Sequence, residues 1–161
     1  ARIEPENKID VILEAFSKLP NEKLVLVGNW QTNEFGRSMR GMYASFDNIM
    51  MLDPIYEKHK INLLRSNCKL YIHGHSAGGT NPSLVEAMYL GLPIIASDVV
   101  YNRATTEQKA LYFQDADDLL AKVKKVVGDV TLLKTMGQIM GEIAERRYLW
   151  SVIISKYESL Y

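Results

Sequence analysis

The stretch HSAGGTNPSLVEAMYLGLPIIASD, residues 75–98, joins a loop of small residues, a helix start and a buried strand. Gly78 and Gly79 tolerate backbone angles closed to other residues, and they let a ligand approach the main chain. Asn81 is a typical N-cap for a helix that opens with Pro82. Free N–H groups at such a helix start attract phosphate. The stretch therefore predicts an anion held between a glycine loop and a helix N-terminus.

Glu86 lies one turn inside the same predicted helix. A carboxylate repels phosphate but accepts hydrogen bonds from hydroxyl groups. A ligand that carries both phosphate and hydroxyl groups suits the helix start and Glu86 together, and we therefore predict a nucleotide sugar. The alternatives are an ordinary capped helix after a tight loop, and a solvent-exposed glutamate that binds no ligand.

The composition fits one globular domain. The chain has 161 residues, of which 47% are hydrophobic and 24% charged, enough for a full core. Lys plus Arg and Asp plus Glu both number 19, so no basic excess argues for binding to nucleic acid. The single cysteine, Cys68, excludes an internal disulfide and favours a reducing compartment. No apolar stretch approaches twenty residues, so we expect no membrane-spanning helix.

Apolar strands alternate with amphipathic helices along most of the chain. The predicted helices cover residues 8–19, 34–46, 56–66 and 82–90, and the predicted strands cover residues 24–27, 49–52, 70–73, 93–97 and 111–113. Parallel strands need crossover connections, which helices normally supply. The pattern predicts a doubly wound α/β domain with a parallel sheet, similar to a Rossmann fold.

Two closing helices are predicted over residues 115–127 and 129–157, so that about 115–161 completes a single domain of residues 1–161. The second is expected to kink or break between Gly137 and Gly141. Its last part, residues 145–161, mixes basic with apolar side chains. Packing on a domain and peripheral contact with a membrane are the two interpretations of that composition.

Ligands of such folds bind beyond the carboxyl ends of the strands, where the strand order reverses. The residues that follow predicted strands are Arg2, Gly28, Asp53, the loop 75–81 and Asp98. With the strand order 3-2-1-4-5-6, Arg2 is expected to face Gly78 and Gly79, as a guanidinium suits a diphosphate. Asp53 is either a contact to the base or ribose or an ordinary turn residue before a proline.

His73 and His75 have the spacing of two metal ligands, but alternate side chains of an extended segment point to opposite faces. We therefore predict no metal site. His75 is expected either to contact phosphate or sugar, or to hydrogen-bond within the loop. Ser76 and Ser83 lack the Gly-x-Ser-x-Gly setting of a hydrolase nucleophile.

Three segments carry a resemblance that extends over nearly the whole chain: ARIEPENKIDVILEAF at 1–16, LVLVG at 24–28 and PSLVEAMYLGLPIIASD at 82–98. They resemble the C-terminal, nucleotide-sugar-binding half of GT-B glycosyltransferases, especially glycosyltransferase family 4. The resemblance implies that Glu86 holds the ribose hydroxyls and that Arg2 contacts the diphosphate. The donor-binding residues expected from the chemistry and the resemblance together are Arg2, Lys8, Gly28, His75, Gly78, Gly79, Thr80, Asn81 and Glu86.

Two positions depart from the family pattern. Family members commonly carry a glutamate, within Glu-Gly-Phe-Gly, where this chain has Gly78, so the usual contact to the donor sugar is absent. The phosphate-binding lysine of the family falls on Asn7, and Lys8 is a substitute whose side chain would leave in another direction. The variant HSAGGTNPSLVE resembles a branch associated with bacterial surface polysaccharide synthesis, rhamnosyltransferases included.

The resemblance implies transfer of a sugar, with retention at the anomeric carbon, to a saccharide or lipid-linked acceptor bound by a separate N-terminal domain. Arg2, Lys8 and the helix dipole at Asn81 would stabilise the charge on the leaving diphosphate, so we expect no metal. We also expect a cytoplasmic protein, with peripheral association at the inner face of the membrane left open. Because the chain starts at Ala1 in the middle of the expected fold, we expect a piece of a longer protein that is inactive alone. No residue is predicted as a general base.

Two alternatives have other functions. Loss of the first family glutamate favours a non-catalytic nucleotide- or phosphate-binding module. A sugar-nucleotide epimerase is disfavoured because no acid and base pair lies beside the predicted phosphate loop.

Overall fold

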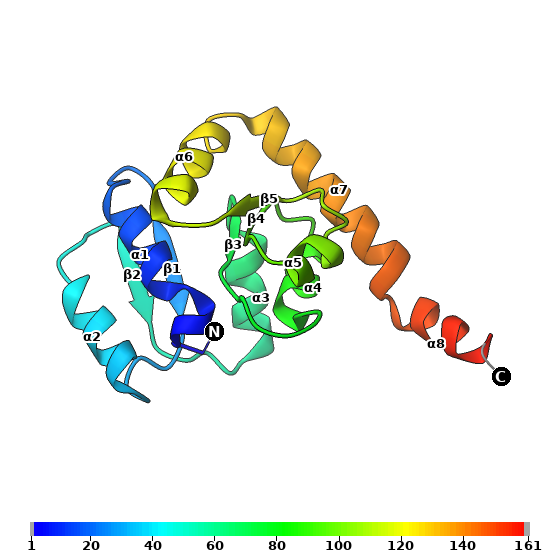
Figure 1. The fold of residues 1–161 in the computed structure, drawn as a ribbon, viewed down its shortest axis with the longest axis horizontal. Coiled ribbons are helices and arrows are strands. Elements are labelled where there is room, and N and C mark those ends of the chain that lie inside the picture. The colour runs from blue at the N-terminus through cyan, green and yellow to red at the C-terminus, as the bar shows by residue number, and fades with distance from the viewer. Residues whose placement is uncertain (1, 160–161) are drawn as a thin grey trace.

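A computed structural model describes residues 2–159, and for residues 155 and 156 it describes the backbone only (Figure 1). The elements in chain order are η1 (Pro5–Asn7, a 3-10 helix), α1 (Ile9–Ser17), β1 (Leu24–Val27), α2 (Glu34–Met42), β2 (Ile49–Leu52), α3 (Lys58–Ser66), β3 (Tyr71–His73), α4 (Pro82–Tyr89), β4 (Ile94–Ser97), α5 (Val100–Thr105), β5 (Leu111–Phe113), α6 (Ala116–Val126), α7 (Val130–Tyr148) and α8 (Trp150–Glu158). The predicted alternation of helices and parallel strands is confirmed.

The strands form two parallel sheets. β1 pairs with β2, in the register Leu24 opposite Ile49, and β4 lies between β3 and β5. Figure 1 shows α1 and α2 beside the first sheet and α4 and α5 beside the second. The predicted α/β class with parallel strands is therefore confirmed. The pair β1–β2 corresponds to 3-2 of the order 3-2-1-4-5-6, and β3–β4–β5 corresponds to 4-5-6.

The expected central strand ending near Arg2 is not formed within residues 2–159. The carbonyl oxygen of Arg2 accepts a hydrogen bond from Asn7 Nδ2, and the carbonyl oxygen of Ile3 accepts one from Asn33 Nδ2. These carbonyl oxygens thus bond to asparagine side chains of η1 and of the N-cap of α2.

The core lies on both sides of β4, whose four residues are all buried. Ile95 joins a cluster built mainly from α1 and α6. Ile94 and Ala96 join a second cluster built mainly from α4 and α7. Successive side chains of a strand point to opposite faces, so β4 presents one face to each cluster. Burial on both faces fixes this sheet between two layers of helices.

The prediction of a kink between Gly137 and Gly141 is wrong, because α7 runs unbroken through both glycines. A Cβ at Gly137 would lie 2.2 Å from the carbonyl oxygen of Gly91, so the glycine allows a close approach of two backbones. The helix stops instead at Leu149, which has an extended conformation. The glycine serves tertiary packing, which the sequence pattern did not reveal.

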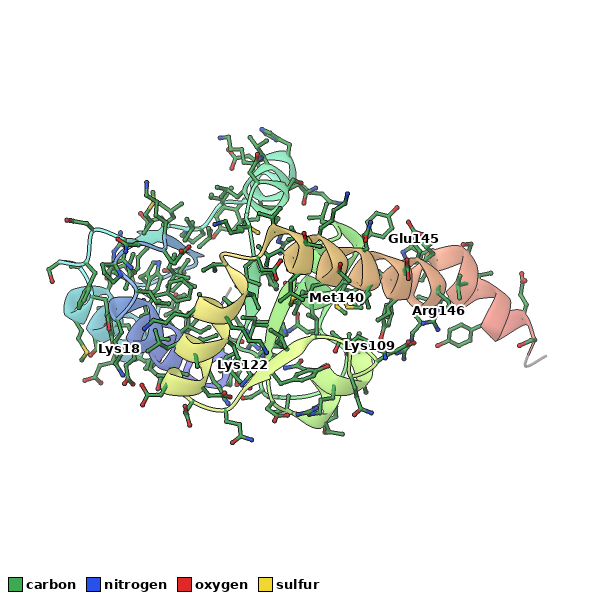
Figure 2. The ribbon with its side chains drawn as sticks, turned by 90° about the horizontal axis from the view of Figure 1, so that it is seen from above. Lys18, Lys109, Lys122, Met140, Glu145 and Arg146 are labelled. Carbon is green, nitrogen blue, oxygen red and sulfur yellow. The ribbon has the colours of Figure 1, made fainter. Side chains whose placement is uncertain are left out.

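α8 projects beyond the other elements in both views (Figures 1 and 2). Trp150, Ile154 and Tyr157 expose 77%, 51% and 64% of their surface. α8 therefore leaves these apolar side chains uncovered by this domain, and residues 160–161 lie outside the described residues. Within residues 2–159, none of the helices has the length and apolar character needed to cross a bilayer.

Candidate functional site

The loops after β1 and β2 meet at the carboxyl edge of the first sheet. The Gly28 N–H donates to the carbonyl oxygen of Leu52 at 3.1 Å, and Trp30 Nε1 donates to the same oxygen at 3.0 Å. A cavity of about 390 Å³ opens there. Its lining residues are Arg2, Ile3, Glu4, Val27, Gly28, Asn29, Thr32, Asn33, Pro54, Ile55, Tyr56, Ile61 and Arg65. Two of the predicted donor-binding residues, Arg2 and Gly28, therefore share one cavity.

The Arg2 guanidinium is held by carboxylates of its own segment. It bonds Glu6 at 2.8 Å and lies 3.6 Å from Glu4, and its side chain is 69% exposed. In the part of the chain that the structure describes, Arg2 makes no hydrogen bond or ion pair with the loop 75–81. The expected opposition of Arg2 and the glycine loop is thus not a direct contact.

The loop after β3 is tied to η1. Ser76 donates to the carbonyl oxygen of Glu6 through both its N–H and its hydroxyl, at 2.9 and 2.8 Å. A Cβ at Gly74 would lie 2.0 Å from the carbonyl oxygen of Asn7, so only glycine allows this approach. The two segments are therefore in backbone contact although about seventy residues separate them.

His75 and Asn7 form a side-chain pair, with His75 Nδ1 2.7 Å from Asn7 Oδ1. Asn7 Nδ2 donates to the Arg2 carbonyl oxygen, so Asn7 Oδ1 faces the imidazole as acceptor and His75 Nδ1 carries the proton. Among the described residues, His75 Nε2 has no hydrogen-bond partner. Of the two interpretations of His75, the hydrogen bond within the loop region is present, and Nε2 remains for a ligand.

Asn102 holds the same loop from the other side. Its Nδ2 donates to the carbonyl oxygens of His75 and Ser97, both at 2.9 Å, and the residue is 3% exposed. It belongs to α5, a short helix that the sequence analysis missed because six residues give too little periodicity. Asn102 thereby fixes the end of β3 relative to the end of β4.

The helix start of α4 has the predicted local geometry. Asn81 Oδ1 accepts a hydrogen bond from the Ser83 N–H at 2.9 Å, which confirms the N-cap. Gly78 has φ +61, and nothing lies within 4 Å of a Cβ built on Gly78 or Gly79. Gly78, Gly79 and Thr80 are exposed. The loop therefore presents open backbone beside a capped helix N-terminus.

Glu86 is engaged by a residue that the sequence analysis did not single out. Arg65 of α3 donates from Nη1 to Glu86 Oε2, and the two side chains are 18% and 53% exposed. Arg65 also lines the cavity that contains Arg2 and Gly28. No sequence signal marks this pair, because 21 residues and a strand separate its members.

Lys8 and Asp53 lie apart from these groups. Lys8 Nζ donates to the carbonyl oxygen of Gln114 at 3.2 Å and lies 5.5 Å from the centre of the Phe113 ring, just beyond β5. The Lys8 side chain thus points away from the side chain of Asn7, which bonds His75. This difference in direction between positions 7 and 8 was expected from the sequence. Asp53 is 72% exposed and pairs with Arg40 at 2.8 Å.

Two titratable groups follow neighbouring strands. Hydrogen bonds from Arg103 to both oxygens of Asp98, at 2.5 and 2.9 Å, lower the pKa of that carboxyl group. His73 on β3 is 4% exposed, and desolvation lowers its pKa to about 4, with a smaller contribution from His75. Asp98 is therefore ionised and His73 neutral near pH 7.

Residues 1–140 match the family of glycosyl transferases group 1. The fold is similar to that of HepE from Anabaena in complex with UDP, with a TM-score of 0.85, 17% identity and coverage of 99% of this chain and 46% of HepE. Sucrose-phosphate synthase from Thermosynechococcus elongatus gives a TM-score of 0.84 and 22% identity, with coverage of 100% of this chain and 43% of the synthase.

A separately solved C-terminal domain is also similar. The domain of LpcC from Francisella tularensis, a glycosyl transferase group 1 family protein, gives a TM-score of 0.78 and 14% identity, with 92% of this chain and 83% of that one covered. The chain spans less than half of the first two proteins. Because the family match covers residues 1–140 and the fold is that of the C-terminal domain of GT-B glycosyltransferases, this chain belongs to the glycosyl transferases group 1 family.

Proposed function

We propose that this chain is the donor-binding domain, residues 1–161, of an enzyme that transfers a sugar from a nucleotide diphosphate sugar to a saccharide or lipid-linked acceptor. The observation that carries the proposal is the helix start of α4, where open glycine backbone, the Asn81 cap and Glu86 follow one another. This arrangement offers N–H groups to phosphate and a carboxylate to hydroxyl groups. The UDP bound in the similar HepE structure supports a nucleotide as the ligand.

The cavity supports the same ligand from the other sheet. A nucleotide bound at α4 must also place a base and ribose, and about 390 Å³ of space is open beside Gly28, Tyr56 and Arg65. The hydrogen bond from Arg65 to Glu86 connects this cavity to α4. We assign the phosphates to the start of α4, the ribose to Glu86, and the base to the cavity.

In this proposal catalysis is electrostatic and positional. The positive end of the α4 dipole, together with Arg2, stabilises the charge that grows on the leaving diphosphate. Lys8, expected from the sequence to share this role, donates to the carbonyl oxygen of Gln114 instead. We propose that these two sources of positive charge replace a divalent cation, so that no metal is required. Because His75 Nδ1 carries the ring proton, Nε2 contributes an acceptor for a sugar hydroxyl.

The finer parts of the proposal rest on the sequence resemblance. They are membership of glycosyltransferase family 4, retention at the anomeric carbon, a part in bacterial surface polysaccharide synthesis, and action in the cytoplasm, including the inner face of the membrane. The acceptor would bind to a further, N-terminal domain, so the 161-residue chain alone is expected to bind the donor without transferring its sugar.

Titration calorimetry of the chain with UDP, GDP, dTDP and their sugar derivatives tests the proposal. We expect selective binding of one base, weakened by Glu86→Ala and by Arg2→Ala. Lys124→Ala, in the exposed last turn of α6, is the matched control and should bind as the unsubstituted chain does. A folded chain that binds none of these ligands would contradict the proposal.

A non-catalytic nucleotide-binding module is the second candidate, and glycine in place of the first family glutamate, at Gly78, favours it. Transfer or hydrolysis by the whole protein, abolished by Glu86→Gln, separates the two. Nucleotide binding without turnover in the whole protein would favour the module.

A further inference from the structure

Arg65 contacts both halves of the proposed nucleotide site. It lies in the last turn of α3, lines the cavity with Arg2 and Gly28, and donates a hydrogen bond to Glu86 on α4. Its side chain is 18% exposed, whereas that of Glu86 is 53% exposed. The guanidinium is thus held between the cavity and the one carboxylate assigned to the ribose.

The contact leaves part of Glu86 open to a ligand. Arg65 occupies Oε2, and Oε1 has no partner among the described residues. A charged donor on one oxygen fixes the plane of the carboxylate, while the other oxygen remains an acceptor. Fixing an exposed glutamate in advance spares side-chain entropy on binding.

We infer that Arg65 is a positioning residue of the donor site, which orients Glu86 so that its free oxygen accepts hydrogen bonds from the ribose hydroxyls. The inference rests on the proposed function, since it takes Glu86 as the ribose-binding group. It adds α3 to a site otherwise built from the segment at Arg2, the loops after β1 and β3, and α4.

A purely structural role for Arg65 predicts a different pattern. Partly exposed ion pairs contribute little to the free energy of unfolding, and none of the residues of α3 is buried. Loss of Arg65 should therefore leave the fold intact and change the binding of ligands that reach Glu86. If Arg65 instead competed with ribose for Glu86, its removal would tighten binding.

The test compares ligands with and without ribose hydroxyls. The 161-residue chain is titrated with UDP, GDP and dTDP and with their dideoxy forms, which lack both hydroxyls. The variants are Arg65→Ala, Arg65→Lys, Glu86→Gln and the double variant Arg65→Ala with Glu86→Gln. Lys60→Ala is the control, because Lys60 lies on the same helix, pairs with Glu57 and does not line the cavity. Circular dichroism shows whether each variant folds.

We expect Arg65→Ala to weaken binding of the preferred nucleotide about tenfold and to leave binding of its dideoxy form within about twofold. Arg65→Lys should restore part of the loss, and the double variant should bind no more weakly than Glu86→Gln. Equal loss for both ligands, no loss, or tighter binding by Arg65→Ala would overturn the role of Arg65 while leaving the proposed function standing. Failure of the unsubstituted folded chain to bind any of the nucleotides would overturn both.

Discussion

His75 donates from Nδ1 to Asn7 Oδ1 at 2.7 Å, although 68 residues separate the two along the chain. Asn7 stands where the resembled family has a phosphate-binding lysine. In this protein the position instead fixes the ring of a histidine in the loop that leads to α4. The pair links η1, which carries Glu6 beside Arg2, to the loop after β3.

Replacing Asn7 by leucine removes two hydrogen bonds at once, one to His75 and one to the carbonyl oxygen of Arg2. We expect the free energy of unfolding to fall by about 1–3 kcal/mol. Urea denaturation measures the change. Asn67→Ala is the control, since its amide bonds only the carbonyl oxygen of Leu63 in its own helix, and it should cost clearly less. Equal losses in the two variants would show that the Asn7 contacts carry no tertiary stability.

His73 makes the stability depend on pH. Its pKa is about 4 in the folded chain and about 6.5 when unfolded, so between these values the unfolded chain binds more protons. Its contribution to stability is thus fully present above about pH 6.5 and is lost as the pH falls toward 4. The loss is at most about 3 kcal/mol.

The measurement for His73 is urea denaturation of the unsubstituted chain and of His73→Phe between pH 4 and 7.5. The difference in unfolding free energy between the two should change in favour of the variant as the pH falls. His59→Phe, on the exposed side of α3, controls for the removal of a histidine as such. A difference that stays constant across this range would contradict the burial of a neutral His73.

Substituting Gly137 by alanine places a Cβ 2.2 Å from the carbonyl oxygen of Gly91. Backbone atoms cannot move aside cheaply, so α7 must shift away from the turn after α4. We expect a loss of about 1–3 kcal/mol in thermal or urea unfolding. Gly41→Ala is the opposite case, because Gly41 lies within α2 with nothing within 4 Å, and alanine there should stabilise the protein by about 0.5–1 kcal/mol.

Gly79→Ala separates binding from folding. Nothing lies within 4 Å of a Cβ at Gly79, so the melting temperature should stay within about 2 °C. The methyl group would nevertheless occupy the space through which phosphate approaches the backbone, and nucleotide binding should weaken about tenfold. Gly128→Ala, also without neighbours within 4 Å but far along the chain, should leave binding unchanged. Unchanged affinity of Gly79→Ala would place the phosphates elsewhere.

Nucleotide binding is expected to survive removal of divalent metal. The proposed charge partners of the diphosphate are the α4 N-terminus and Arg2, which are both parts of the chain. Calorimetric titration in excess EDTA should therefore give the same affinity as titration with added Mg²⁺ or Mn²⁺, within about twofold. An affinity that collapses in EDTA and returns with the metal would contradict a metal-independent site.

The local features of the candidate site were predictable because they depend on neighbouring residues. The Asn81 cap follows from an asparagine before Pro82, and the exposed glycine loop follows from two consecutive glycines without bulky neighbours. The same local reasoning failed at Gly137. A glycine inside a helix normally destabilises the helix. Gly137 is nevertheless needed for the close contact with Gly91, which lies in the turn after α4.

The sequence by itself determined the α/β class, the parallel strands and the helix start of α4, because periodicity and capping are encoded within a few residues. Only the tertiary structure decided which side chains share the site. Arg65 meets Glu86 because the end of α3 comes close to α4, and Asn7 meets His75 because η1 lies against the loop after β3. Such pairs arise from how whole elements pack, and neither member carries a local signal of its partner.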